Sequence, residues 1–208
     1  MAEHYYTNAP TSKHEERHIS AQIGNRCLRF ETDAGTFSKE HMDPGSRLLI
    51  DTVPALSGRV ADIGCGWGAI GISLAVKNPD AFIEMVDVNE RALALAQKNA
   101  AGNAVANVRI FASDALAEVE AGLSFAVTNP PIRAGKQVIY KMFADAAVSL
   151  KEGGALYLVI RKQQGAESCV KYLKTLFNEV EKLDKSAGFW VLKAYEPKND
   201  TEGDTDEV

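Results

Sequence analysis

The sequence of 208 residues has no long apolar run, no pair of closely spaced cysteines and no cluster of metal ligands. Without a stretch of about 20 apolar residues, no membrane helix is expected. The polar start MAEHYYTNAPTSKHEERH predicts no export signal. The three cysteines, Cys27, Cys65 and Cys169, are scattered and odd in number, which argues against a disulfide framework and a zinc knuckle. We therefore expect a cytoplasmic protein whose thiols are reduced.

Histidines are also few, and they lack the spacing of metal ligands. All four lie within the first 41 residues: His4, His14, His18 and His41. The sequence thus predicts no metal site. It gives no indication of an oligomeric state.

Negative charge is present, but it is concentrated at one end. The formal net charge is −5, and residues 196–208 alone carry six acidic residues and one basic residue. Residues 133–174 carry eight basic and three acidic residues. A neutral body with a basic region is compatible with an RNA partner, although a solvated helical face would account for the same charges.

The chain is predicted to have three parts: a small N-terminal extension in residues 1–55, a main domain in 56–196 and a disordered acidic tail in 197–208. Residues 1–20 show little periodicity, so we expect an arm there rather than a core element. The rest of the extension is predicted to form a strand over 26–32 and a helix over 43–54, with Pro44 in the first turn of the helix.

From residue 59 onward, apolar strand patterns alternate with helix patterns. The predicted strands are 59–63, 81–88, 107–113, 123–128, 155–161, 178–185 and 188–196, and the predicted helices are 68–78, 89–102, one within 136–154 that ends at Gly153-Gly154, and 166–177. Such alternation is typical of a parallel sheet covered on both faces. We therefore predict an α/β, Rossmann-like fold with a seven-stranded, mostly parallel sheet and a C-terminal antiparallel hairpin.

A glycine-rich loop follows the first strand of the main domain and opens a helix. The segment VADIGCGWGAIG contains Gly64, Gly66 and Gly68, with Cys65 between the first two. Glycines allow a backbone to turn sharply and approach a ligand, and a helix N-terminus carries unpaired N–H groups. The loop alone would also pass as a dinucleotide fingerprint.

Acidic residues near three successive strand ends narrow the choice of ligand. Asp62 is predicted to lie just inside the glycine loop, where it would receive an amine or order the turn. Asp87 ends the second strand, where a carboxylate can hold a ribose diol, and Asp114 follows the third strand, suited to an adenine amine. An amine, a diol and an adenine together describe S-adenosylmethionine. The alternative interpretation is that Asp87 and Asp114 are each a helix N-cap, and Asn89 is a further candidate for a cap.

The fourth strand ends in TNPPIRAGK, where two adjacent prolines exclude both a helix and further sheet pairing. At this point the chain resembles class I S-adenosylmethionine-dependent methyltransferases. The resemblance rests on DIGCGWG, on Asp87-Val88-Asn89, on Ser113-Asp114-Ala115 and on NPPI. The segments HYY at 4–6, DAGTFSKEHMDPGSRLLI at 33–50 and RKQQGAESC resemble the small-subunit (16S) ribosomal RNA guanine-N2 methyltransferases and their short single-domain relatives.

The resemblance implies a mechanism for the NPP turn. The side-chain oxygen of Asn129 and the backbone carbonyl of Pro130 would accept hydrogen bonds from an exocyclic purine amine, and Pro131 would fix the turn in advance. Asn129 would also border the cofactor, and RNA would be the partner. Many relatives have an aromatic residue after the second proline, where this chain has Ile132, an apolar side chain that would still cover a ring face of the base. The missing ring is predicted to come from Phe37, unless Phe37 is a core residue.

Two basic residues after the turn, Arg133 and Lys136, would hold phosphates beside a flipped base, or they are ordinary surface charges. Trp67 and Trp190 are expected to pack rather than to bind a base. Alternative activities are methylation of adenine N6 in RNA or DNA, methylation of a protein glutamine, and RNA binding without catalysis.

Overall fold

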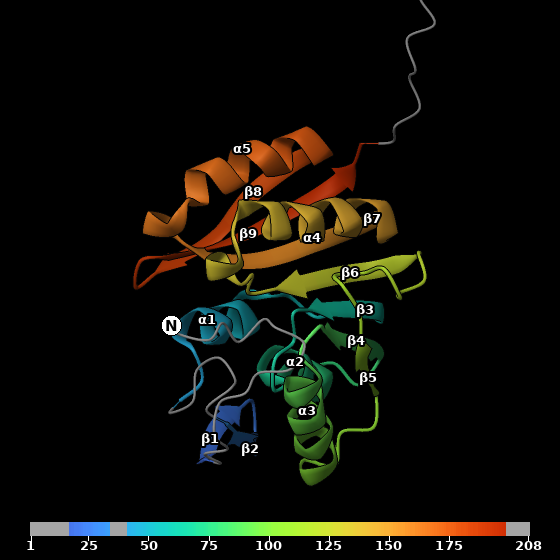
Figure 1. Ribbon diagram of the computed structural model, residues 1–208, viewed down its shortest axis with the longest axis vertical. Coiled ribbons are helices and arrows are strands. Elements are labelled where there is room, and N and C mark those ends of the chain that lie inside the picture. Colours follow the sequence, from blue (N-terminus) through green and yellow to red (C-terminus); the bar gives the residue numbers. More distant parts are fainter. Residues whose placement is uncertain (1–16, 34–40, 199–208) are drawn as a thin grey trace, which may run out of the picture.

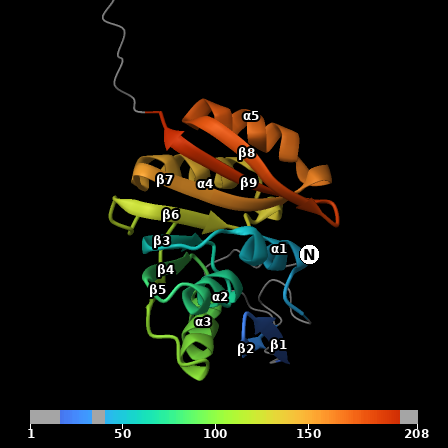
Figure 2. The same cartoon turned by 180° about the vertical axis from the view of Figure 1, so that it is seen from behind.

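A computed structural model of the chain describes residues 17–33 and 41–198. It contains a two-stranded sheet and a seven-stranded sheet. Figures 1 and 2 show the small hairpin beside helix α3 at one end of the molecule, and helix α5 with strand β8 at the other. Phe37, and the segment 4–6, lie outside the described residues.

The seven strands have the order β5-β4-β3-β6-β7-β9-β8. The strands are β3 (Gly58–Ile63), β4 (Ala81–Asp87), β5 (Val108–Ala112), β6 (Leu123–Thr128), β7 (Leu150–Arg161), β8 (Phe177–Ser186) and β9 (Phe189–Pro197). The first five pair in parallel, and β9 pairs antiparallel with both β7 and β8. The predicted seven-stranded, mostly parallel sheet with a C-terminal antiparallel hairpin is confirmed.

Helices cover both faces of this sheet. They are α1 (Pro44–Thr52), α2 (Ala69–Lys77), α3 (Glu90–Gly102), α4 (Lys136–Ser149) and α5 (Ala166–Leu176), with short 3-10 turns η1 (Ile132–Ala134) and η2 (Lys162–Gln164). Leu49 of α1 and Ile72 of α2 belong to one apolar cluster, and Phe143 of α4 and Leu173 of α5 belong to another. The sheet therefore separates two cores, as its apolar strands require.

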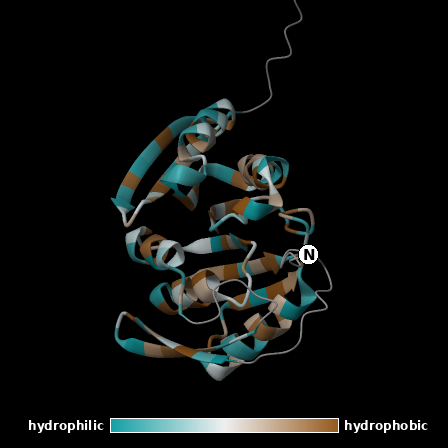
Figure 3. Cartoon of the chain, turned by 60° about the vertical axis from the view of Figure 1, so that its left-hand side comes forward, coloured by the Kyte–Doolittle hydropathy of each residue, from teal (hydrophilic) through white to brown (hydrophobic). Residues whose placement is uncertain are grey.

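The apolar composition of the central strands accounts for their burial on both faces. Val60 and Ala61 of β3, on opposite sides of the sheet, are both fully buried, as are Val127 and Ala126 of β6. Figure 3 shows the hydrophobic colour in the central strands, whereas the edge strand β8 is largely hydrophilic. Strands buried on both faces need continuous apolar runs, and an exposed edge strand tolerates charges.

The expectation of an arm over residues 1–20 is wrong from residue 17 onward, because β1 (Arg17–Ile23) pairs with β2 (Arg26–Thr32) in an antiparallel hairpin. Every second residue of RHISAQI faces inward, and Ile19 and Ile23 are buried. Asn99 of α3 and Asn103, the C-cap residue of that helix, bind the backbone of β2 at Glu31 and Arg29, and each amide both donates and accepts. The hairpin is thereby attached to the main sheet's core.

The expected end of the fourth helix at Gly153-Gly154 is also wrong. Helix α4 ends at Ser149, and both glycines lie within β7. A Cβ on Gly154 would lie 2.9 Å from Lys151 O and 3.0 Å from Ser124 O. The glycine is needed for the close approach of β7 to β6, not to stop a helix.

The topology favours a ligand site at the carboxyl ends of the central strands. From β3 the chain moves outward to β4 and β5, then returns to the other side of β3 at β6. The carboxyl ends of β3 and β6 therefore diverge into connections on opposite faces. Ligands of open α/β sheets bind in the crevice outside such a switch point.

Candidate active site

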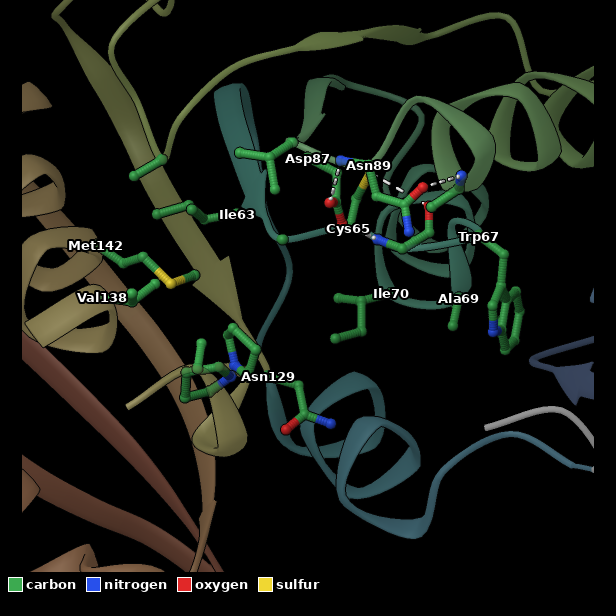
Figure 4. A pocket seen from close by; sticks show the side chains of 18 of the residues that line it. Ile63, Cys65, Trp67, Ala69, Ile70, Asp87, Asn89, Asn129, Val138 and Met142 are labelled. Atoms are coloured by element: carbon green, nitrogen blue, oxygen red, sulfur yellow. Dashed lines mark hydrogen bonds between the residues drawn. The ribbon is translucent and has the colours of Figure 1, made fainter. Parts of the chain in front are cut away.

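A cavity of about 530 Å³ lies at this switch point. Figure 4 shows Asp87 and Asn89 on one side of it, Asn129 on another, Val138 and Met142 on the α4 side, and Ile70 of α2 facing them. Its volume is in the range of small-molecule and cofactor sites. The lining residues come from the ends of β3, β4 and β6, from the loop after β5, and from α1, α2, α3 and α4.

The glycine loop forms one wall. Gly64, Gly66 and Gly68 all have positive φ, at 73°, 55° and 96°, a region that side chains disfavour. The N–H groups of Gly64 and Cys65 both donate to Val86 O, at 2.8 and 2.9 Å. No described atom lies within 4 Å of the position that a Cβ on Gly66 would take. The loop is thus tied to β4 and presents bare backbone to the cavity.

Asp87 connects this loop to the next. Its Oδ2 accepts from Gly66 N and its Oδ1 accepts from Asn89 N, each at 2.9 Å. Burial raises the pKa of the Asp87 carboxyl, and the backbone N–H groups that it accepts from oppose this shift. Asn89 caps α3 by accepting from Arg91 N and Ala92 N. Asn89, and not Asp87, is therefore the N-cap of α3, and the Asp87 carboxylate instead accepts a hydrogen bond from the glycine loop.

Asp62 lies within β3, not inside the loop as expected, and it is fully buried without lining the cavity. Its Oδ2 accepts from Gly71 N at 2.8 Å, which orders the start of α2. Its Oδ1 is buried without a hydrogen-bond partner among the described residues. Desolvation by burial raises the pKa of Asp62 to about 7, against the lowering effect of the Gly71 N–H and with a further rise from the charge of Asp87.

The loop after β5 contributes Ser113, Asp114 and Ala115. Ser113 N donates to Asp87 O at 3.1 Å, and Ser113 Oγ accepts from Glu118 N at 3.1 Å. Asp114 has a side chain that is 68% exposed and lies 3.4 Å from Lys141 Nζ. A polar group at the cavity's rim is therefore kept in place by a lysine of α4.

The NPP turn closes the cavity from the end of β6. Thr128 Oγ1 donates to Ile63 O at 2.8 Å, which ties the end of β6 to the end of β3. Pro131 O accepts from Ala134 N at 2.8 Å and so begins the η1 turn. Within residues 17–33 and 41–198, no hydrogen bond to Pro130 O or to Asn129 Oδ1 is present. Two acceptors are thus available at the turn.

The Asn129 amide is held from α1. Its Nδ2 donates to Asp43 Oδ2 at 3.0 Å and to Ser46 Oγ at 2.9 Å. Asp43 and Ser46 also line the cavity. Neither residue was predicted to belong to the site, although the segment DPGS lies in the stretch that carries the resemblance. The only local signal in the sequence is a capping residue before a Pro at the first helical position.

Other lining residues that sequence reasoning missed are mainly apolar. They are Ile63, Trp67, Ala69, Ile70, Ala92, Ala134, Val138 and Met142. Trp67 also packs against Phe30 with ring centroids 5.1 Å apart, so it packs as expected and still borders the cavity. These residues carry no chemical signature, and only the fold brings them together.

The remaining predicted site residues are divided between cavity and surroundings. Val88, Pro130, Pro131 and Arg133 line the cavity. Gly68, Ile132 and Lys136 do not: Gly68 precedes α2, Ile132 packs against the core of the α4 face, and Lys136 begins α4 on the surface. Trp190 lies under Lys182, whose Nζ is 3.3 Å from the ring centroid.

Two kinds of feature are absent from the described part of the chain. No group of three or more His, Cys, Asp or Glu side chains in residues 17–33 and 41–198 has an arrangement that would hold a metal ion. None of the helices in the same residues has both the length and the apolar character that a bilayer crossing requires.

Comparisons with known proteins agree on one family. A family model described as the methyltransferase small domain matches residues 27–193. A Bacillus subtilis protein called "Uncharacterized protein YbxB" is 44% identical over 198 residues, covering 93% of this chain and 98% of its own length. A Vibrio vulnificus ribosomal RNA small subunit methyltransferase C is 35% identical over 185 residues, covering 86% of this chain but 52% of its own length.

Among solved structures, the 16S rRNA N2 methyltransferase RsmC of T. thermophilus, in complex with AdoMet and guanosine, superposes with a TM-score of 0.78. It is 27% identical, and the match covers 90% of this chain and 52% of that one. The chain thus spans about half the length of the relatives that carry the methyltransferase C name.

Proposed function

The chain belongs to the methyltransferase small domain family, and from this premise we propose that it transfers a methyl group from S-adenosylmethionine to the exocyclic N2 amine of a guanine in small-subunit ribosomal RNA. The activity of the relatives named methyltransferase C is that of chains about twice as long. The cavity and the likeness to these relatives together support guanine N2 in ribosomal RNA as the methyl acceptor.

The residues of the cavity fit S-adenosylmethionine. The bare backbone at Gly66 leaves room for a ligand beside the loop, and the Asp87 carboxylate lies at the end of β4, where a ribose diol is held in this class of fold. Ser113 and Asp114 would contact the adenine. The buried Asp62 Oδ1 behind the loop has no hydrogen-bond partner among the described residues, and a cation bound at the loop would favour the ionised form of this carboxyl group. When bound, the cofactor supplies an electrophilic methyl group.

On the other side of the cavity, the NPP turn would hold the methyl acceptor. Asn129 Oδ1 and Pro130 O would accept the two hydrogens of a planar amine, which favours a more pyramidal nitrogen with its lone pair directed at the methyl group. Because the turn is rigid, these acceptors are in place before the reaction. The turn and the glycine loop would align the two reactants, which accounts for much of the acceleration. A strong base is unnecessary, since the nitrogen becomes acidic once it is methylated.

One observation carries this proposal: Asn129 borders the same cavity as the glycine loop and presents an amide whose oxygen has no donor in the described residues. A dinucleotide-dependent dehydrogenase offers no reason for such an acceptor. Arg133, exposed at the cavity's rim, would contact a phosphate of the flipped nucleotide, and Lys136 would contact one further out on the surface.

The test is methyl transfer from radiolabelled S-adenosylmethionine to small ribosomal subunits and to bare 16S RNA, both from a strain lacking the protein. Digestion to nucleosides and mass spectrometry should identify N2-methylguanosine. Recovery of N6-methyladenosine, or of a methylated glutamine in a ribosomal protein, would contradict the guanine assignment. Binding of RNA with no methyl transfer to any of these acceptors would contradict catalysis.

The matched variant is Asn129→Ala. It removes the acceptor without altering the glycine loop, so kcat should fall by about 10²–10³-fold, as for loss of one preorganised polar group. The Kd of S-adenosylmethionine, measured by calorimetry, should change less than about 3-fold. An unaltered kcat would remove Asn129 from the mechanism.

A further inference from the structure

We propose that Asp43 and Ser46 are positioning residues that decide which atom of the Asn129 amide faces the methyl acceptor. This inference rests on the proposed function, since it concerns the same site. An asparagine side chain ends in an acceptor and a donor of nearly equal size. With the oxygen toward the substrate it would bind an amine, and with the NH2 group toward the substrate it would repel one. The orientation therefore determines whether the site can use an amine at all.

The contacts at Asn129 fix this orientation. Asp43 Oδ2 accepts from Ser46 N at 2.9 Å as well as from Asn129 Nδ2 at 3.0 Å. An atom that already accepts from a backbone N–H favours a donor as its second partner, and the NH2 group of Asn129 is that donor. Ser46 Oγ takes the second hydrogen at 2.9 Å. With both hydrogens bound on the α1 side, only Oδ1 is left for the substrate.

The position of Asp43 is itself well determined. Asp43 is the N-cap of α1, and Pro44 occupies the first helical position, where a missing N–H costs nothing. A Cβ on Gly45 would lie 2.8 Å from Phe189 Cε1 and 2.9 Å from Asp43 Oδ2, so a glycine is needed for α1 to start against β9. Arg47 NH1 donates to Gln22 O at 2.6 Å, which ties the helix to the hairpin.

Rotating the Asn129 amide by 180° would place its oxygen against Asp43. Two acceptors would then face each other, and the cost would be that of an unmade charge-assisted hydrogen bond plus the repulsion. The carboxylate therefore stabilises a single orientation. A neutral amide at position 43 could turn its NH2 group toward a rotated Asn129 at the cost of only the capping bond from Ser46 N, so it would select the orientation far less strongly.

The substitution that tests this is Asp43→Asn. Asparagine caps helices as well as aspartate does, so α1 and the fold should persist. We expect kcat for methyl transfer to fall by about 10- to 100-fold, with the Kd of S-adenosylmethionine unchanged within about 3-fold. Asp51→Asn is the matched control: it makes the same change of charge near the other end of α1, at an exposed residue that forms an ion pair with Arg47 and does not line the cavity, and it should retain the wild-type kcat.

A double-mutant cycle separates positioning from a general structural effect. If Asp43 acts through Asn129, then Asp43→Asn should change kcat by less than about 3-fold in the Asn129→Ala background. A wild-type kcat for Asp43→Asn, or an equal loss with and without Asn129, would overturn the proposal. Ser46→Ala should give a smaller loss in the same direction, because the Asp43 contact remains.

Nuclear magnetic resonance provides a readout that needs no substrate. Both side-chain amide protons of Asn129, assigned by their disappearance in Asn129→Ala, should exchange slowly with solvent in the wild type and faster in Asp43→Asn. The proposed positioning would be refuted if the Asn129 amide protons of the wild type exchanged as fast as those of exposed asparagines. It would also be refuted if Asp43→Asn left their exchange rate unchanged. If the wild type methylated no RNA but its protons behaved as expected, the assigned reaction would fail and the positioning would stand.

Discussion

Replacing Asp87 with asparagine removes one charge from the cavity while keeping the size of the side chain. In the wild type, the two carboxylate oxygens accept from Gly66 N and from Asn89 N, each at 2.9 Å. An asparagine has one acceptor oxygen, so one of these two N–H groups would face an NH2 group instead. The ribose diol of the cofactor would lose an ionised acceptor at the same time.

The magnitude follows from these contacts. A hydrogen bond to a charged group contributes about 1.5–3 kcal/mol, which corresponds to an increase of about 10- to 100-fold in the Kd of S-adenosylmethionine. The melting temperature should change little, because burial raises the pKa of the Asp87 carboxyl, and the folded protein is relieved of a buried charge as it loses a hydrogen bond. At saturating cofactor, kcat should remain within about 3-fold.

Titration calorimetry of the wild type and Asp87→Asn measures this effect, with Asp51→Asn as control. The Asp51 side chain is exposed and does not line the cavity, and its pairing with Arg47 is of the surface kind that contributes little. The Kd of S-adenosylmethionine for this control should therefore stay within about 2-fold of the wild-type value. An unchanged Kd in Asp87→Asn, or a loss of kcat without a loss of affinity, would refute the assignment of Asp87 to the cofactor.

Three further outcomes are expected. Burial raises the pKa of Asp62 from 3.8 to about 7, so between these pH values the folded state binds a proton that the unfolded state has lost. As pH rises from about 4 to 7, the wild type should therefore lose stability relative to Asp62→Asn, by on the order of 4 kcal/mol at most. Urea unfolding measures this, and a stability difference that does not depend on pH would contradict the raised pKa. Gly154→Val should destabilise by about 2–4 kcal/mol because its Cβ meets backbone oxygens, whereas Gly102→Ala, with open space around it, should stabilise slightly; equal melting temperatures would show that β7 can shift. Arg133→Ala should weaken binding of ribosomal RNA and reduce its salt dependence without changing cofactor affinity, and an unaltered salt slope would place the RNA elsewhere.

The sequence was sufficient to predict the sheet and the helices that follow its strands. The alternation of apolar strand segments with helix segments predicted a parallel sheet, because strands of this kind are buried on both faces by helices. Gly66 follows β3, Asp87 ends β4 and Asn129 follows β6. These three strands are neighbours in the sheet, and the carboxyl ends of parallel strands lie on the same side. Their meeting in one cavity was therefore predictable.

What the sequence could not show depends on contacts between distant segments. Asp43 precedes Asn129 by 86 residues, and nothing local indicates that the two side chains meet. Asp62 lies within a strand instead of the loop. Its burial and its hydrogen bond from Gly71 N depend on how α2 packs, which the local sequence does not show. Gly154 has the same local signal as a helix stop, and only the approach of β7 to β6 distinguishes the two roles.

The central claim is that an exocyclic amine is held at the NPP turn while the cofactor's sulfur lies beside the glycine loop. A crystal structure of the protein with S-adenosylhomocysteine and a guanine nucleoside tests it most directly. We expect the sulfur in the cavity between Gly66 and Asn129, and the guanine N2 atom within hydrogen-bond distance of Asn129 Oδ1 and Pro130 O. A cofactor bound elsewhere, or a base whose amine points away from Asn129, would contradict the account.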